Sequence, residues 1–270
     1  MLKQRILTAS ILAPIVLCGV FLLPLEAFAV FMGVVTLLGA WEWGPLSGIR
    51  SPALRLAYVM VVFLSLILCW GLFGAGIELY LLLPALLLWC ISFVWVLRYP
   101  AVGGWSSSVV RLAIGVLVLA AAWLSLLKLK SLESGNAWLL LVLLIVWAAD
   151  IGAYFSGKRW GKVKLAPNVS PGKTREGVYG GLVAVVVTAL IFALWNELTG
   201  AAIVYLVLLS IIVGFVSVMG DLFESLLKRF TGIKDSGSIL PGHGGVLDRI
   251  DSILAAAPFF CLGLYFLPIN

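Results

Sequence analysis

The chain has 270 residues and a net charge of +6; 63% of its residues are apolar, only 11% are charged, and its mean hydropathy is +1.17. Soluble globular domains carry roughly 25% charged residues, so 18 basic and 12 acidic side chains cannot supply a polar shell for a chain of this length. The composition excludes a soluble enzyme, a secreted disulfide scaffold and a disordered chain, and it predicts a polytopic membrane protein.

Long apolar stretches run through the whole sequence. Each approaches the ~20 residues that a helix needs to cross a bilayer, and none shows the alternation of period two that barrel strands require. We therefore expect an all-α, polytopic integral membrane bundle of about nine transmembrane helices. In chain order the predicted spans are 6–23, 27–43, 54–73, 79–97, 109–127, 138–156, 178–195, 201–227 and 252–267.

The first predicted span has features of a secretory signal peptide. Lys3 and Arg5 precede the apolar run, and Ala27-Phe28-Ala29 has the small residues of a cleavage site. The run 6–23 is, however, longer than the apolar region of usual signal peptides, and the sequence becomes apolar again from Val30 onward. We expect the segment to remain as the first helix of the bundle.

Basic residues are distributed unevenly between alternate flanks of the spans. One set of flanks carries only Lys128 and Lys130, and the other set carries all the remaining residues among the 18 Lys and Arg. Cytoplasmic flanks of membrane helices are enriched in Lys and Arg, so we expect a cytoplasmic N-terminus and a C-terminus on the opposite side. The net charge reflects this asymmetry, and we expect no nucleic-acid partner.

The chain changes character near residue 148. Before this point the spans carry almost no ionisable groups and their connections are short, whereas two polar segments, 157–177 and 228–251, follow it. We therefore expect 1–147 to form an N-terminal unit of structural, lipid-facing helices. The region 148–270 is predicted to be the catalytic membrane region, with both polar segments as cytoplasmic loops.

The sixth predicted span contains a carboxylate near its cytoplasmic end. Asp150 and Tyr154 lie at positions i and i+4 and therefore share one face of the helix. A carboxylate within a membrane span is unfavourable unless it is paired, hydrated or bound to an ion. Asp150 is either a structural partner of a basic loop residue or a contact for a substrate or ion.

The eighth predicted span ends in a polar stripe. Asp221, Glu224, Ser225 and Lys228 follow one another at i, i+3, i+4 and i+7 on a single face, with Arg229 beside them. Carboxylate oxygens of this kind suit Mg²⁺, which usually takes one or two carboxylates together with substrate phosphates. The alternative is a polar cluster that holds neighbouring helices together.

The segment that leads into the seventh span is basic and begins with Ser170. Gly172-Lys173-Thr174 is similar to the end of a P-loop, but that motif needs glycine where this chain has Pro167, and no strand-like run precedes it. Phosphate binding is still expected here, because a helix N-terminus and basic side chains attract anions. Contact with anionic lipid headgroups is the alternative.

The last polar segment surrounds the chain's single histidine, His243, with glycines. Lys234 and Asp235 precede it, and Asp248-Arg249-Ile-Asp251 follows, so that the two aspartates fall one turn apart at a helix start. Glycines allow a backbone to approach a ligand closely. His243 is either structural or a ligand contact, and one histidine without nearby cysteine excludes a zinc site of the usual composition.

These motifs together resemble the signature of the phosphatidate cytidylyltransferase (CDP-diacylglycerol synthase) family of bacterial type. Asp150 to Tyr154 and Ser170 to Thr174 are similar to two further stretches of that family, and the recognisable part covers about 148–258. The motifs that carry the resemblance are Ser225-Leu-Leu-Lys228-Arg229, Lys234-Asp235, Pro241-Gly-His243-Gly-Gly245 and Asp248-Arg249-Ile-Asp251.

The resemblance implies a nucleotidyltransferase of phospholipid biosynthesis that converts phosphatidic acid and CTP into CDP-diacylglycerol and pyrophosphate. It also implies Mg²⁺ as cofactor, membrane lipids as surroundings and a homodimer. The active site is expected in the bacterial cytoplasmic (inner) membrane, open to the cytoplasm. We expect direct attack of a phosphatidate oxygen on the α-phosphorus of CTP, supported mainly by positioning and charge neutralisation.

The resemblance assigns expected roles to the polar residues. The catalytic candidates are Asp150, Lys173, Asp221 and Asp248. The expected metal ligands are Asp221 and Asp248, supported by Asp235 and Asp251. Expected nucleotide and phosphate contacts are Ser170, Lys173, Thr174, Lys228, Arg229, Lys234, His243 and Arg249. Tyr154, Glu224 and Ser225 are expected to line the same cavity.

Two other functions fit a membrane protein with these charges. A transporter of a phosphorylated solute would place charges near membrane helices, but it is expected to show broken helices at the midplane and related halves, whereas these charges cluster at the cytoplasmic end. An enzyme that moves a phospho-alcohol onto CDP-diacylglycerol would carry a different aspartate-rich motif, which this sequence lacks.

Overall fold

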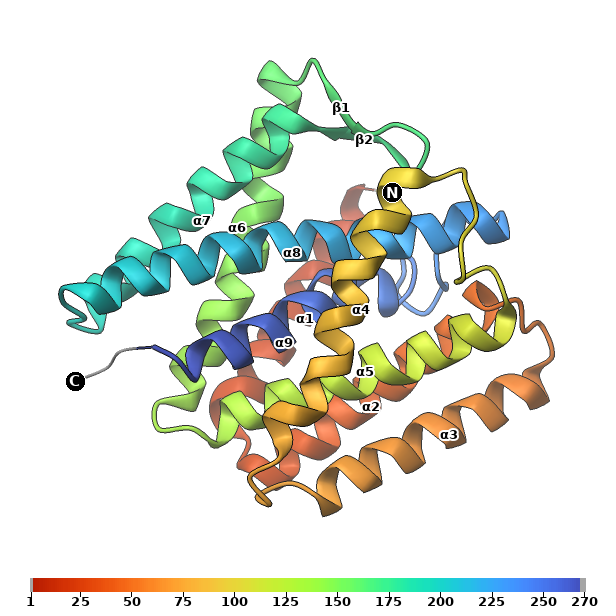
Figure 1. The fold of residues 1–270 in the computed structure, drawn as a ribbon, viewed down its shortest axis with the longest axis horizontal. Helices are drawn as coiled ribbons and strands as arrows, with labels where there is room; N and C mark the ends of the chain where they lie inside the picture. Colours follow the sequence, from red (N-terminus) through yellow and green to blue (C-terminus); the bar gives the residue numbers. More distant parts are fainter. Residues whose placement is uncertain (1, 268–270) are drawn as a thin grey trace.

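A computed structural model of the chain describes the backbone of residues 2–267 and the side chains of residues 8 and 10–267. In this part of the chain, nine helices follow one another, and one short hairpin interrupts them between the sixth and the seventh (Figure 1). The helices are α1 Leu2–Leu22, α2 Leu25–Leu46, α3 Pro52–Gly71, α4 Glu78–Arg98, α5 Ser108–Ser131, α6 Gly135–Trp160, α7 Arg175–Trp195, α8 Ala201–Thr231 and α9 Leu247–Leu264.

The predicted class, an all-α polytopic bundle, is confirmed. Among the described residues, seven helices, α2 to α8, are long and apolar enough to cross a membrane. The apolar part of α1, Ser10–Leu22, is shorter. About nine membrane crossings therefore stay a prediction, although each predicted span corresponds to one helix of the structure.

The core of the bundle is built around α5, whose middle is buried on nearly every side. Leu119, Leu124 and Leu127 of α5 are almost completely buried. At the periphery, α3 exposes large apolar side chains such as Leu64 and Leu68. Such an exposed apolar surface is the expected counterpart of lipid tails.

Small residues allow α6 and α7 to pack closely. A Cβ atom on Gly152 would lie 2.7 Å from the carbonyl oxygen of Gly180, and one on Gly181 would lie 2.6 Å from that of Ala149. Close backbone approach through small residues is a common basis of helix association in membranes. The contact sets the position of Asp150, one residue after Ala149, and of the hairpin that connects the two helices.

The hairpin is an element that the sequence analysis did not anticipate. Strands β1 Lys164–Ala166 and β2 Ser170–Thr174 pair in antiparallel fashion, with Lys164 opposite Thr174. The strands are too short to show a period in sequence, which is why the segment was expected to be a loop. Arg229 of α8 donates from Nε to the carbonyl oxygen of Val169 at 3.1 Å and ties the hairpin to the bundle.

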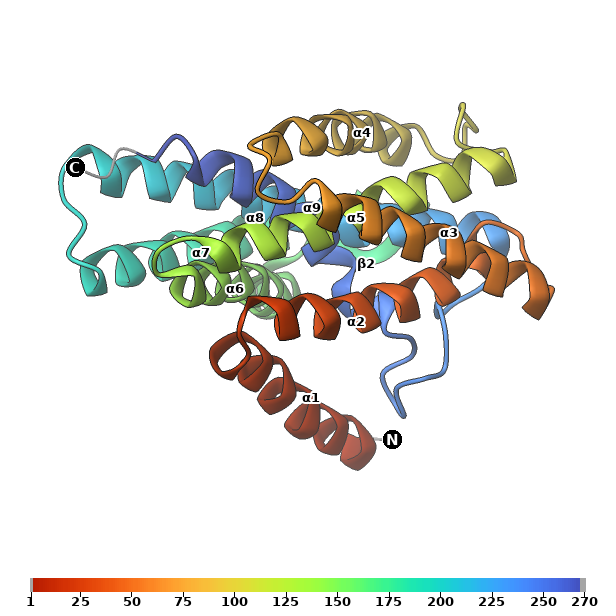
Figure 2. The ribbon, with the colours of Figure 1, turned by 90° about the horizontal axis from the view of Figure 1, so that it is seen from below.

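The antiparallel helices separate the connections into two ends. Figure 2 shows the connections after α2, α4 and α8 towards one end, and those after α3, α5 and α7 towards the other. This grouping agrees with the alternate flanks on which the basic residues were counted. Figure 2 also shows that α1 diverges from the other helices towards its N-terminus.

Candidate active site

A cavity of about 620 Å³ lies between α1, α2, α6 and the start of α9. Its two ends differ in chemistry. One end is polar and draws on α6, α8, α9 and the connection between α8 and α9, whereas the other is walled by aliphatic and aromatic side chains of α1, α2 and α6. The apolar wall includes Leu12, Val16, Phe31, Met32, Leu143 and Val146. The predicted catalytic region therefore shares its cavity with helices of the first half.

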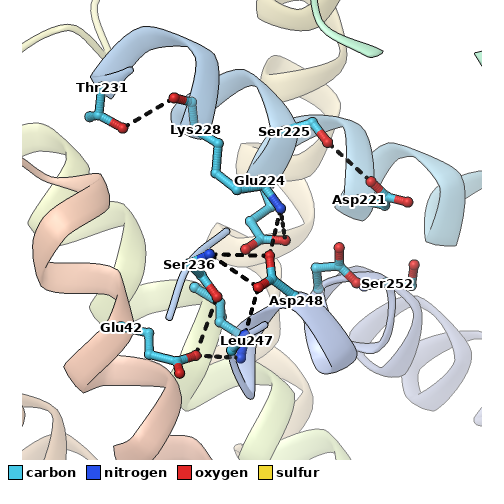
Figure 3. A network of polar contacts seen from close by, with 12 residues as sticks. Glu42, Asp221, Glu224, Ser225, Lys228, Thr231, Ser236, Leu247, Asp248 and Ser252 are labelled. Carbon is cyan, nitrogen blue, oxygen red and sulfur yellow. Dashed lines mark hydrogen bonds and ion pairs between the residues drawn. The ribbon is translucent and has the colours of Figure 1, made fainter. Parts of the chain in front are cut away.

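Lys228 occupies the centre of the polar end. Its Nζ lies 2.7 Å from Oδ1 of Asp248 and 3.2 Å from Oε2 of Glu224, one helical turn earlier on α8 (Figure 3). All three side chains are largely buried, with exposed fractions of 14% for Lys228, 7% for Asp248 and 3% for Glu224. Burial strengthens such charge-assisted contacts, because little water is present to screen them.

Asp248 is fixed by the loop in front of it. Its Oδ2 accepts hydrogen bonds from the backbone N–H groups of Gly245 at 2.8 Å and Ser236 at 3.1 Å. The adjacent Gly244 has a φ of +82°, and a Cβ atom there would lie 2.6 Å from Asp248 Oδ2. Glycine is therefore required at this position both for the backbone conformation and for the approach to the carboxylate.

Asp221 connects the stripe on α8 with the hairpin. Its Oδ2 lies 2.8 Å from Nζ of Lys173 at the end of β2, and its Oδ1 accepts from the hydroxyl of Ser225 at 3.2 Å. Figure 3 shows Asp221 and Ser225 side by side on one face of α8. Two of the three predicted phosphate-binding lysines, Lys173 and Lys228, are thus paired with predicted metal-ligand carboxylates.

Asp251 is another largely buried aspartate at this end. Only 9% of the residue is exposed, and its Oδ1 accepts from the N–H of Ser252 at 2.7 Å. A Cβ atom on Gly220 of α8 would lie 2.5 Å from the Asp251 carbonyl oxygen. This close contact between α8 and α9 places Asp251 beside the residue that precedes Asp221.

Four more predicted site residues line the cavity, and none of them forms an ion pair with another side chain that the structure describes. They are Asp150 of α6, Asp235 and His243 of the connecting loop, and Arg249 of α9. Nδ1 of His243 is buried and has no hydrogen-bond partner among the described residues. Aspartates, histidine and arginine therefore face one space that lies beside the lysine pairs.

Other predicted residues lie away from the cavity. Thr174 is buried and caps α7, because its hydroxyl accepts from the N–H of Gly177 at 3.2 Å. Tyr154 is 62% exposed and lies under the ammonium group of Lys158. Ser170 pairs with Ala166 in the hairpin, and Lys234 is exposed. Arg229 is exposed as well, and its contact with Val169 holds the hairpin.

Glu42 of α2 belongs to this network although the sequence analysis did not select it. Its carboxylate is 1% exposed and accepts at Oε2 from the N–H of Leu247 at 2.7 Å and from the hydroxyl of Ser236 at 3.3 Å. The available signal was a single acidic residue between two tryptophans in an otherwise apolar span. The first half of the chain was interpreted as structural, so this signal was not used.

The donor chemistry of the polar end fits a magnesium ion that is completed by substrate. Among the side chains that the structure describes, no group of three or more His, Cys, Asp or Glu residues is arranged as a ready-made metal site. Mg²⁺ commonly takes one or two carboxylates and completes its shell with water and phosphate oxygens. Glu224 adds a further buried carboxylate, which pairs with Lys228 and contacts the side chain of Asp251.

Comparisons with known proteins agree with the motif resemblance. The family model described as "Cytidylyltransferase family" matches residues 3–267. A phosphatidate cytidylyltransferase of Pseudomonas aeruginosa is 48% identical over 98% of this chain and 97% of its own length. A phosphatidate cytidylyltransferase of Haemophilus influenzae is 40% identical over 98% of this chain and 99% of its own length. One of Bacillus subtilis is 42% identical over 57% of this chain and 58% of its own length.

Proposed function

The chain belongs to the cytidylyltransferase family and is a nucleotidyltransferase, and from this premise we propose that it transfers CMP from CTP to phosphatidic acid. The products are CDP-diacylglycerol and pyrophosphate, and the pathway is phospholipid biosynthesis. The predicted function is the same as that of the similar proteins, each of which covers a large part of this chain.

The observation that carries the proposal is the chemical division of the cavity. A phosphatidate molecule has a phosphate headgroup and two apolar chains, and the cavity offers basic and acidic groups at one end and an apolar wall at the other. A water-soluble phosphorylated substrate has no apolar chains that could pack against the apolar wall. The lipid phosphate and the nucleotide triphosphate would meet at the polar end.

The reaction is a displacement at the α-phosphorus of CTP. A phosphatidate oxygen forms the new P–O bond, the bond to the bridging oxygen of the β-phosphate breaks, and pyrophosphate leaves with its electron pair. Three cations suit the phosphate charges: Lys173, Lys228 and Arg249. No general base is required, because the attacking phosphate is already ionised. Positioning and charge neutralisation carry such transfers.

We propose Mg²⁺ as the cofactor and Asp221 and Asp248 as its leading ligands. Asp235 and Asp251 support them, since both line the same polar end. When bound, the ion supplies charge neutralisation for the phosphate oxygens. Lys173 and Lys228 hold Asp221 and Asp248, so these charges remain paired before substrate binds.

The polar end is proposed to face the cytoplasm of a bacterial cell, in the inner membrane. The loops 157–177 and 228–251 carry most of the basic residues, and such residues favour the cytoplasmic side. CTP is a cytoplasmic metabolite in this proposal, and the site is accessible to it from that side. A homodimer and surrounding membrane lipids remain part of the proposal on the basis of the family resemblance.

The test is pyrophosphate release by the purified protein in lipid nanodiscs. We expect release from CTP when phosphatidic acid is present, and none when diacylglycerol or water-soluble glycerol 3-phosphate replaces it, because only phosphatidic acid combines the nucleophile with the apolar chains. Uptake of a phosphorylated solute into sealed vesicles without pyrophosphate release would instead support a transporter and contradict the proposal.

A further inference from the structure

The loop between α8 and α9 surrounds a buried carboxylate that comes from a distant helix. Glu42 of α2 lies between Ser236 in the first half of the loop and Leu247, the first residue of α9, and it accepts a hydrogen bond from each. Figure 3 shows its side chain pointing from α2 towards these two residues. The first half of the loop and the start of α9 are therefore joined through one side chain.

The same residues fix Asp248. Ser236 donates its hydroxyl to Glu42 and its backbone N–H to Asp248, while Leu247 donates to Glu42 and directly precedes Asp248 in the chain. Asp248 in turn holds Lys228 at 2.7 Å. A continuous set of hydrogen bonds thus runs from Glu42 through Ser236 to Asp248 and on to Lys228.

The loop is shaped around the carboxylate of Glu42. A Cβ atom on Gly237 would lie 2.1 Å from Glu42 Oε1, and one on Gly245 would lie 2.4 Å from Glu42 Oε2. Neither contact leaves room for a side chain. Both glycines lack the positive φ that would by itself demand glycine. Space for the carboxylate excludes larger residues at Gly237, and at Gly245 the carboxylate excludes them together with the Ser236 hydroxyl, which would lie 2.2 Å from the added Cβ atom.

We propose that Glu42 is a positioning residue for the transfer reaction, which holds the loop 236–247 so that Asp248 and Lys228 meet the reacting phosphates. The inference rests on the proposed function. It goes beyond helix packing, because a buried carboxylate that only joined helices would not need its donors to be Ser236, which also donates to Asp248, and Leu247, which directly precedes Asp248. Misplacing a catalytic group by about 1 Å can reduce a rate about 100-fold.

The test is a comparison of Glu42→Ala, Glu42→Gln and wild type in the nanodisc assay. Glu42→Gln keeps an oxygen that accepts from Leu247 and Ser236, so we expect it to retain activity within about threefold. Glu42→Ala removes the acceptor, and we expect kcat to fall tenfold or more, while KM for CTP changes less than about threefold. A uniform loss in both variants would show that the residue matters only for packing or charge and would overturn the inference.

A second variant tests the same contact from the loop. Gly237→Ala places a methyl group against Glu42, and no other side chain lies within 3 Å of that methyl group. We therefore expect this change to lower kcat about tenfold in the wild-type background. In the Glu42→Ala background the methyl group has space, and we expect no further loss. Equal losses in both backgrounds would contradict a role through Glu42.

The controls separate this inference from the proposed function. Thermal unfolding of each variant shows whether it is folded, and activity is compared at a temperature well below its transition. Inactive wild-type protein with CTP and phosphatidic acid would contradict the proposed function itself. Active wild type with unchanged kcat in Glu42→Ala would leave the function standing and overturn the positioning role.

Discussion

At the scale of single residues, carboxylates and lysines at and beside the polar end of the cavity hold one another in place. Lys228 binds both Glu224 and Asp248, and Lys173 binds Asp221. The arrangement keeps buried charges paired when no substrate is bound, which lowers the cost of burying them. Incoming phosphates and a cation can then exchange partners with these groups.

Replacing Asp221 or Asp248 with Asn is expected to reduce kcat about 100-fold or more at saturating Mg²⁺. Each change removes one negative charge from the proposed ligand set, and preorganised charges of this kind have effects of this size. Steady-state kinetics in nanodiscs measure the loss, and Glu133→Gln, an exposed change between α5 and α6, is the control. Near-normal activity of either variant would remove that residue from the ligand set.

Lys173→Ala is expected to lose about 2–4 kcal/mol of transition-state stabilisation, because its contact with phosphate is charge-assisted and partly desolvated. Lys158→Ala and Lys162→Ala are matched controls from the same segment. Both lysines are exposed, and a charge near lipid headgroups contributes only about 1 kcal/mol. The comparison uses kcat/KM for CTP at a fixed surface concentration of phosphatidic acid. Small and equal losses in the three variants would withdraw Lys173 from the site.

At the scale of secondary structure, hydropathy was sufficient to find each helix, because long apolar runs have few other solutions in a membrane. The helical spacing also predicted the contacts within α8, where Ser225 binds Asp221 and Lys228 binds Glu224. The hairpin was missed because strands of three and five residues carry no detectable period. Thr174 was selected as a phosphate contact, whereas its position before α7 makes it a helix cap.

The contact between α6 and α7 gives a prediction about stability. Gly152→Ala would bring a methyl group to 2.7 Å from a backbone carbonyl oxygen, which no side-chain rotation can relieve. We expect a destabilisation of about 1–3 kcal/mol, typical of overpacking, and a lower midpoint of thermal unfolding in detergent. Gly104→Ala, where the added methyl group meets nothing within 4 Å, is the control. An unchanged midpoint of unfolding in Gly152→Ala would show that α6 and α7 can move apart to accept the methyl group without a loss of stability.

At the scale of the whole molecule, the fold brings together segments that are far apart in sequence. Glu42 lies about 200 residues before Ser236 and Leu247, which it joins. No local pattern records such a contact, and the pairing of Lys173 with Asp221 also joins residues that are distant in sequence. The motifs therefore selected polar residues that the fold brings together, such as Asp221, Lys228 and Asp248, and also residues that lie away from the cavity, such as Thr174. The pairing of these residues, the contribution of Glu42 and the apolar wall from α1 and α2 required the folded chain.

The orientation of the molecule is tested by labelling with an impermeant thiol reagent. In a background without the native cysteines, we expect Lys162→Cys and Ser238→Cys to react only after the cytoplasmic membrane is opened, because basic flanks favour the cytoplasm. Glu133→Cys, at the opposite end of the bundle, is expected to react in intact cells. Labelling of Lys162→Cys in intact cells would overturn the proposed topology and the cytoplasmic entry of CTP.

The central claim is that one cavity joins a lipid phosphate to the α-phosphate of CTP. The most direct measurement follows two radioactive forms of CTP, labelled at the α- or the γ-phosphate, in nanodiscs that contain phosphatidic acid. We predict that the α-label enters the lipid extract and that the γ-label leaves as pyrophosphate, in equal amounts. Label from the γ-position in the lipid, or no label in the lipid while CTP is consumed, would contradict the account.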